Sequence, residues 1–283
     1  MADVAAAPQH AQIVYRHSLM VRITHWVNAL CLLVLLLSGL QIFNAHPALY
    51  LGSTSNPDRA ILSMDAVQRD DGTFAGITTI GSHTFDTTGV FGLSYGPGGQ
   101  LEDRGFPSWL TLPSYRDLAT GRRWHFFFAW LLVLNGAAYL AYAAWSGHVR
   151  RDLAPTRSQL RNIGRSVWEH IRFHFPKGED AKSYNVLQKL AYLAVIFGLL
   201  PLVVLTGLTM SPAMDAAFPF LLDIFGGRQS ARTIHFLCAS AITLFVVVHI
   251  FMVLVSGAWN NIRSMVTGRY VIVPDTGETA DGK

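Results

Sequence analysis

Four long stretches of the chain contain no Asp, Glu, Lys or Arg. These stretches are residues 23–57, 124–149, 190–214 and 233–262. Each contains about 20 apolar residues in succession, which is the length of helix that crosses the hydrocarbon core of a bilayer. The pattern predicts an all-α membrane protein, a bundle of four transmembrane helices in one domain. The predicted helices cover residues 23–43, 124–145, 190–210 and 233–257.

The composition supports a membrane protein. Of the 283 residues, 51% are hydrophobic and only 14% are charged, whereas a soluble domain has about a quarter charged residues. Arg16 and Arg22 precede the first span, as basic residues precede the apolar region of a signal peptide. The span is longer than such a region, however, and no small-residue cleavage site follows Phe43. We therefore expect this span to be retained.

The distribution of basic residues predicts the orientation in the membrane. Residues 146–185, between the second and third spans, are rich in Lys and Arg, and further basic residues precede the first span and follow the fourth. Because Lys and Arg are held on the cytoplasmic side, residues 146–185 should form a cytoplasmic loop, and both termini should be cytoplasmic. This topology accounts for the net charge of +4, so we expect no nucleic-acid partner.

The connection between the first two spans, residues 44–120, should form a long periplasmic loop. It is far longer than an ordinary connection and is rich in Gly, Thr, Ser, Pro and Asp. Alternating residues at 76–80 and 90–93 predict small strands, and residues 96–99 predict a turn. In the cytoplasmic loop, apolar residues recur at helical spacing beside several arginines over residues 160–175, which predicts an amphipathic helix on the inner leaflet.

Two cysteines, Cys31 and Cys238, lie inside predicted spans. Neither belongs to a Cys-x-x-Cys-His motif, which excludes covalently attached haem, and the sequence has no cysteine cluster for an iron–sulfur or zinc site. We interpret both as small buried apolar residues.

Four histidines in the spans are the candidate functional residues, because polar side chains inside a bilayer are costly. Three of them follow an arginine by three residues at the start of a span, a spacing that puts both side chains on one helix face. The imidazole would then ligate a haem iron, and the guanidinium would bind a haem propionate. The three pairs are Arg22–His25, Arg122–His125 and Arg232–His235, and the fourth histidine is His249.

The depth of each histidine predicts how the four are paired. His25 begins a span that enters from the cytoplasmic side, whereas His125 and His235 begin spans that enter from outside. His249 follows His235 by 14 residues, which is about 21 Å of helix and close to four full turns. We therefore predict an outer haem b ligated by His125 and His235, and an inner haem b ligated by His25 and His249.

Other histidines are weaker candidates. His46 is an alternative outer ligand to His125, and His148 is an alternative inner ligand to His25. The remaining five should be solvated in loops or arms; they are His10, His17, His83, His170 and His174. A metal transporter would place Asp or Glu beside intramembrane histidines, and the spans contain neither.

Small residues in or near the spans would allow close approach of a porphyrin or of a neighbouring helix. They are Ser38, Gly39, Gly136, Gly198, Gly207 and Gly257. Pro201 should kink the third span.

The motifs together resemble the prokaryotic cytochrome b561 family. The resemblance is carried by Arg-x-x-His-Trp at Arg22, Arg-x-x-His at Arg122 and at Arg232, His249, and the sequence KSYNVLQK at residues 182–189. The family includes the di-haem cytochrome b subunits of formate dehydrogenase, nickel–iron hydrogenase and thiosulfate reductase. The resemblance implies that His25, His125, His235 and His249 are the axial ligands of two haem b groups.

The resemblance further implies a quinone site near the inner haem, with contacts from Asn185 and Gln188. A polar cap that opens a helix is an equally good interpretation of these two residues. The long outer loop is a departure from the formate dehydrogenase and hydrogenase subunits. It resembles instead the family members that associate with periplasmic molybdopterin oxidoreductases of the sulfite oxidase type.

The expected function is electron transfer between a periplasmic oxidoreductase partner and the membrane quinone pool, by a multi-pass protein of the bacterial inner membrane. One alternative is a stand-alone quinone oxidoreductase that oxidises superoxide or another small donor. A second is a transporter or a structural anchor, which would contain no haem.

Overall fold

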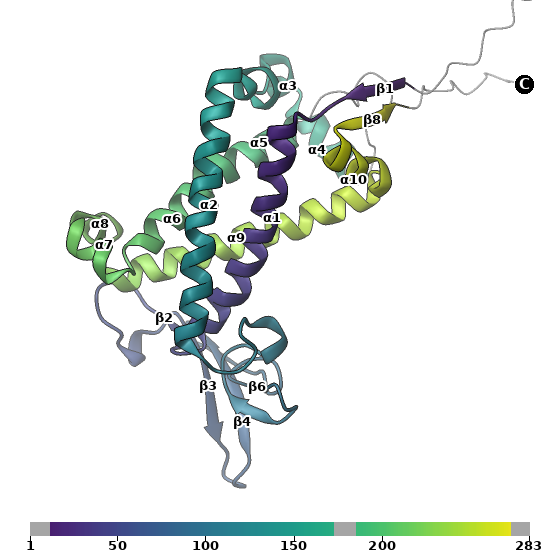
Figure 1. Cartoon of the computed structure of the whole chain (residues 1–283). Coiled ribbons are helices and arrows are strands. Elements are labelled where there is room, and N and C mark those ends of the chain that lie inside the picture. The colour runs from purple at the N-terminus through teal and green to yellow at the C-terminus, as the bar shows by residue number, and fades with distance from the viewer. Residues whose placement is uncertain (1–11, 173–184, 273–283) are drawn as a thin grey trace, which may run out of the picture. The chain divides into compact units, whose positions relative to one another are not determined.

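The computed structural model of the chain describes residues 12–172 and 185–272 (Figure 1). Four helical segments in these ranges are long and apolar enough to cross a membrane. Three are continuous helices, α1 (Leu19–Phe43), α2 (Leu118–Ser146) and α9 (Arg228–Val255). Their large exposed side chains, such as Leu33, Phe127 and Leu244, are apolar and suited to contact with lipid. The predicted fold class, a membrane protein with four spanning helices, is confirmed.

The third span is interrupted near its middle. It consists of α5 (Val186–Ala194), a π-helical turn at Val195–Leu199 and α6 (Leu200–Leu208). Pro201 lies at the start of α6, where its missing N–H removes one helical hydrogen bond. The π-helical turn therefore lies where the sequence predicted a kink.

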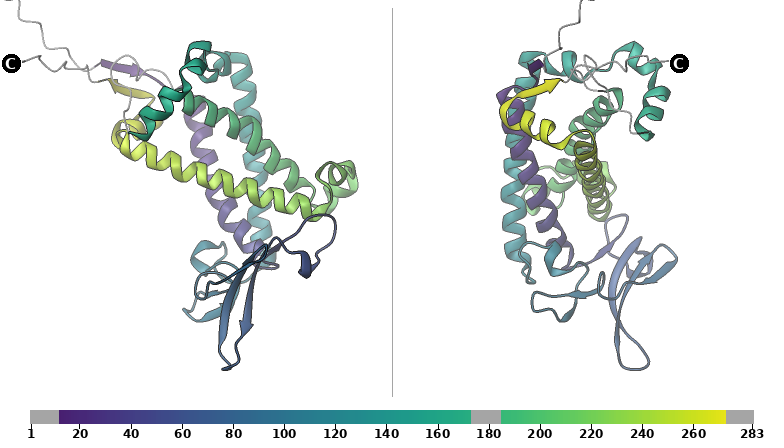
Figure 2. Two further views of the ribbon diagram at one scale, coloured as in Figure 1. Left: turned by 180° about the vertical axis from the view of Figure 1, so that it is seen from behind. Right: turned by 90° about the vertical axis from the view of Figure 1, so that its right-hand side faces the viewer.

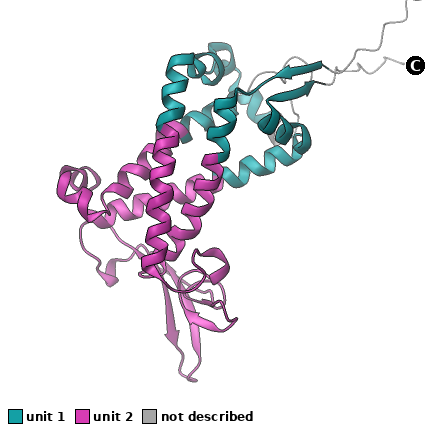
Figure 3. Cartoon of the chain, in the orientation of Figure 1, with its two compact units in different colours: residues 1–26, 137–195, 245–283 teal, residues 27–136, 196–244 magenta. Residues whose placement is uncertain are grey.

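The chain divides into two compact units, shown in different colours in Figure 3. Unit 1 contains residues 1–26, 137–195 and 245–283, and unit 2 contains residues 27–136 and 196–244. Helices α1, α2 and α9 each contribute residues to both units, and the third span changes unit at its π-helical turn.

Unit 2 contains two apolar clusters. In the first, Cys31 and Val34 of α1 pack against Phe128 and Leu132 of α2. In the second, Phe43 at the end of α1 packs with residues of the following loop and with Phe236 of α9; those loop residues are Leu49, Met64 and Phe106. Cys31 and Cys238 are both buried free thiols, as expected.

The loop between α1 and α2, residues 44–117, folds into a β-rich element that we call the cap. Four antiparallel strands lie in chain order: β2 (Ala48–Leu49), β3 (Leu62–Gln68), β4 (Phe74–Ile80) and β5 (His83–Asp86). A second sheet pairs β6 (Leu93–Tyr95) with β7 (Leu101–Asp103). The predicted strand at 76–80 lies within β4 and the predicted turn at 96–99 joins β6 to β7, but of residues 90–93 only the last is in a strand.

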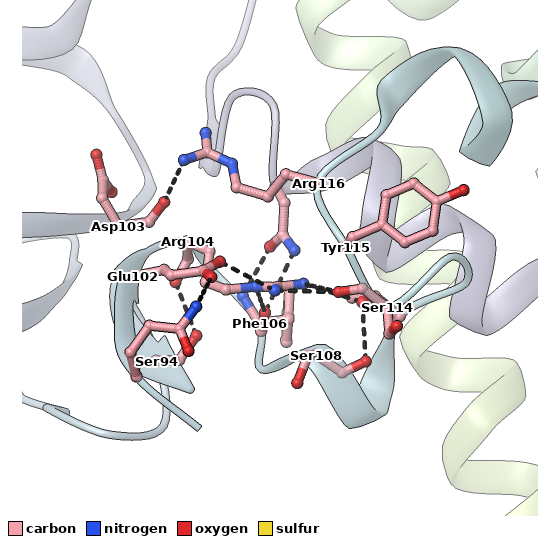
Figure 4. A network of polar contacts seen from close by, with 12 residues as sticks. Ser94, Glu102, Asp103, Arg104, Phe106, Ser108, Ser114, Tyr115 and Arg116 are labelled. Atoms are coloured by element: carbon pink, nitrogen blue, oxygen red, sulfur yellow. Dashed lines mark hydrogen bonds and ion pairs between the residues drawn. The ribbon is translucent and has the colours of Figure 1, made fainter. Parts of the chain in front are cut away.

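A buried arginine holds the cap together (Figure 4). The side chain of Arg104 is fully buried, and its guanidinium donates to the carbonyl of Phe106 at 2.8 Å, to that of Ser114 at 3.1 Å and to the hydroxyl of Thr111 at 3.0 Å. Burial lowers the pKa of Arg104, and the nearby Glu102 partly opposes this effect. The network fixes the irregular chain that leads from β7 into α2.

Short strands and helices precede, connect or follow the spanning helices. In unit 1, β1 (Gln12–Tyr15) pairs with β8 (Arg269–Ile272), which follows α10 (Ala258–Thr267), as Figure 2 shows. The predicted amphipathic stretch at 160–175 forms α3 (Arg157–Arg161) and α4 (Ile163–Ile171), with a break at Asn162, and its last residues lie outside the described ranges. In unit 2, α7 (Pro212–Ala217) and α8 (Phe220–Phe225) connect α6 to α9.

Candidate functional site

The four intramembrane histidines form two pairs, and each pair lies within one unit. In unit 2, the ring centres of His125 and His235 are 6.2 Å apart. In unit 1, those of His25 and His249 are 6.3 Å apart. Since a metal–imidazole bond is about 2.0 Å long and a ring nitrogen lies about 1.1 Å from the ring centre, two imidazoles on opposite sides of one metal ion have centres about 6.2 Å apart. Both pairs therefore fit an iron ion between their rings.

His125, on α2, is held by a serine and a glycine of α1. The Nδ1 atom of its ring lies 3.1 Å from the hydroxyl of Ser38. A Cβ atom on Gly39 would lie 3.3 Å from Cε1 of the ring, closer than an ordinary contact. Because Gly39 has no side chain, the imidazole of His125 can occupy this position without a steric clash.

His235, on α9, is held in the same way by a threonine and a glycine of α6. Its Nδ1 atom lies 2.9 Å from the carbonyl of Val203 and 3.2 Å from the hydroxyl of Thr206. A Cβ atom on Gly207 would lie 3.3 Å from Cε1 of the ring. The serine–glycine and threonine–glycine dipeptides thus make matching contacts with two different histidines.

The His25–His249 pair has mainly aromatic neighbours. His25 contacts Trp26 edge-on, with ring centres 5.3 Å apart, and His249 stacks on Phe245 at 5.9 Å and contacts Tyr192 at 6.4 Å. The Nδ1 atom of His25 is buried and has no hydrogen-bond partner among the described residues.

The three arginines that precede histidines contact other groups of the chain. Arg22 donates from Nη1 to the carbonyl of Val266 at 2.5 Å, while its buried Nε has no hydrogen-bond partner among the described residues. The guanidinium of Arg122 lies 5.6 Å from the ring centre of Phe126. Arg232 donates to the carbonyl of His46. Arg22 is thus the one of the three with a buried donor atom left for an acid group.

Neither alternative ligand joins a pair. His46 stacks on Tyr50 with ring centres 5.6 Å apart, and Nδ1 of His148 lies 2.6 Å from the carboxylate of Asp152. His83 is exposed, as expected, but His17 is buried, contrary to the prediction that it is solvated. Burial and the nearby Arg16 lower the pKa of His17 to about 4. His10 and His174 lie outside the described residues, as does the side chain of His170.

Asn185 and Gln188 form a capping box at the start of α5. The side-chain oxygen of Asn185 accepts from the backbone N–H of Leu187 at 2.9 Å, and that of Gln188 accepts from the backbone N–H of Asn185 at 3.1 Å. Both oxygens satisfy amide groups that the first turn of a helix leaves without partners. The structure therefore gives the pair the capping role that the sequence left open.

Two substitutions at Asn185 separate the capping role from a quinone contact. Because Ser caps a helix about as well as Asn, Asn185→Ser should keep the free energy of unfolding unchanged. Asn185→Ala should lower the free energy of unfolding by about 1 kcal/mol. The measurements are thermal unfolding in detergent and, as a test for a quinone contact, the KM for a quinol analogue. A large rise in the KM for quinol in Asn185→Ser would instead establish a contact with quinone.

One polar contact between two spans had no clear signal in the sequence. Asn135 of α2 donates to Asn28 of α1 at 2.7 Å inside the helical bundle. Of the glycines singled out from the sequence, Gly39 and Gly207 contact histidines, whereas a Cβ atom on Gly136 or Gly198 would meet nothing within 4 Å, as would one on Gly257. The described residues contain no cluster of three or more His, Cys, Asp or Glu that would hold a metal ion without haem.

Comparison with known proteins gives a family and a relative. The family described as "Prokaryotic cytochrome b561" matches residues 16–268. A protein of Azospira oryzae, named putative protein-methionine-sulfoxide reductase subunit YedZ1, is 34% identical over 147 residues, which cover 52% of this chain and 70% of the relative. No solved structure matches the chain.

Proposed function

Because the chain belongs to the prokaryotic cytochrome b561 family, we propose that it is a di-haem subunit that carries electrons between an oxidoreductase outside the membrane and the quinone pool within it. The family and the relative make it a membrane electron-transfer subunit that binds haem b. The proposal adds the number of haems, their ligands, the partner and the quinone.

The observation that carries the proposal is the geometry of the two histidine pairs. His125 with His235, and His25 with His249, have the ring separation of two imidazoles that share one iron. Helix α9 supplies one histidine to each pair, and the 14 residues between them correspond to about 21 Å of helix. Bound haem would supply the one-electron chemistry of its iron. The chain supplies the four imidazoles, their orientation and the exclusion of water.

Arg22 supports a site for haem at the His25–His249 pair. Its buried Nε has no acceptor among the described residues, and it lies three residues before His25 on α1. A haem propionate would satisfy this donor, because guanidinium groups bind carboxylates with charge-assisted hydrogen bonds. We assign the same function to Arg122 and Arg232 at the other pair.

The partner and the orientation follow from different observations. The relative is named as a subunit of a protein-methionine-sulfoxide reductase, which supports an oxidoreductase partner for this chain. We assign that partner to the periplasmic side of a bacterial inner membrane, where it would contact the cap; a molybdopterin enzyme of the sulfite oxidase type is the expected class. The basic residues of the connection at 146–185 support cytoplasmic termini. We assign the quinone site to the His25–His249 end because the family resemblance implies it there.

Purification of the chain from membranes, alone and with co-purifying proteins, tests the proposal. We expect two b-type haems per chain and reduction of both by a quinol analogue under anaerobic conditions. Continuous turnover between the quinol analogue and the partner's substrate should require the periplasmic partner. A colourless protein, or one haem per chain, would contradict the proposal. Rapid quinone reduction by superoxide with the purified chain alone would favour the stand-alone oxidoreductase instead.

A further inference from the structure

His125 and His235, which lie in the same unit as the cap, have hydrogen-bond acceptors that the other pair lacks. His125 lies against Ser38-Gly39 of α1, and His235 lies against Thr206-Gly207 of α6. Both hydroxyl residues are fully buried. We call each of these two dipeptides a histidine dock.

The hydrogen bonds of the docks determine which ring nitrogen carries the proton. The hydroxyl of Ser38 donates its one hydrogen to the carbonyl of Val34 at 2.6 Å, and that of Thr206 donates to the carbonyl of Leu202 at 2.7 Å. Each hydroxyl can then only accept from its histidine, so Nδ1 is the donor in both rings. Nε2 is left with the lone pair that ligates a metal ion.

The His25–His249 pair contains no dock among the described residues. The Nδ1 atom of His25 is buried without an acceptor, and the ring of His249 packs on Phe245. The two pairs therefore share one ligand type and one ring separation but differ in what the second ring nitrogen contacts.

We propose that the docks lower the reduction potential of the haem at His125–His235 below that of the haem at His25–His249, so that electrons move away from the cap. A hydrogen bond from Nδ1–H to an oxygen makes the imidazole a more basic ligand. A more basic ligand stabilises oxidised iron more than reduced iron, and second-sphere hydrogen bonding of this kind tunes haem potentials. In each step one electron is lost at the His125–His235 site and gained at the other. The inference rests on the proposed function and deepens it by assigning a direction.

Isosteric removal of the dock hydroxyls tests this inference. Ser38→Ala and Thr206→Val, singly and together, should shift the potential of one haem to more positive values, with the double variant shifted furthest, and should leave the other haem unchanged. Thr243→Val is the matched control, because this hydroxyl on α9 also donates to a carbonyl of its own helix, and no hydrogen bond joins it to a histidine in the described part of the chain. The measurement is an optical and paramagnetic-resonance redox titration of the purified protein, repeated in a His249→Ala background so that the remaining haem is identified.

The outcomes separate this inference from the proposed function. A protein without two haems would contradict the proposed function itself. With two haems bound, the inference is overturned if the haem that remains in His249→Ala is the one with the higher potential in the wild-type protein. It is also overturned if the double dock variant titrates like Thr243→Val.

Discussion

His249→Ala is expected to remove one haem and to leave the other in place. The His25 ring would keep no opposite ligand, whereas His125 and His235 remain 6.2 Å apart in the other unit. The haem-to-protein ratio should therefore fall from about two to about one, since six-coordinate binding at one site is lost. Quinone-linked electron transfer should be abolished.

The reciprocal variant and a surface histidine complete this test. His235→Ala should remove the other haem, so that the single-haem spectra of the two variants differ and together account for the wild-type spectrum. His83→Ala, on exposed β5, is the control and should retain both haems. Two haems per chain in either intramembrane variant would show that the pairing is wrong.

Gly39→Val and Gly207→Val should each displace a histidine of the His125–His235 pair. A Cβ atom at either position would already lie 3.3 Å from Cε1 of the ring, and the methyl groups of Val would extend further. Overpacking of this kind costs about 1–3 kcal/mol, or roughly a 5-fold to 150-fold loss of haem affinity. The haem at His25–His249 should be unaffected.

Gly198→Val provides the matched control for these substitutions. Gly198 also lies in a span, but a Cβ atom there would meet nothing within 4 Å. Haem titration of the three apo-proteins compares them directly. The glycine contacts have no role in haem binding if Gly39→Val and Gly207→Val bind two haems as tightly as Gly198→Val does.

The sequence was sufficient for the features that depend on local composition. A helix that crosses a bilayer needs about 20 apolar residues, so the uncharged stretches alone predicted four spans. Intramembrane histidines are few, and their depth follows from their position in each span, so the sequence alone predicts the pairs His25–His249 and His125–His235. The capping box at Asn185 and Gln188 is equally local, but its pattern also fits a ligand contact, and only its hydrogen bonds distinguish the two.

The tertiary structure decided which residues lie against each histidine. The spans are apolar on all sides, so the sequence gives no preferred face and leaves the rotation of each helix undetermined. The contacts of Ser38 with His125 and of Thr206 with His235 depend on that rotation, as does the burial of His17 beside the helices. The packing of the cap could not be predicted from the sequence either, because the burial of Arg104 depends on carbonyl groups that residue identity does not encode. Composition thus determined the spans and the chemistry within them, and helix packing determined the surroundings that tune it.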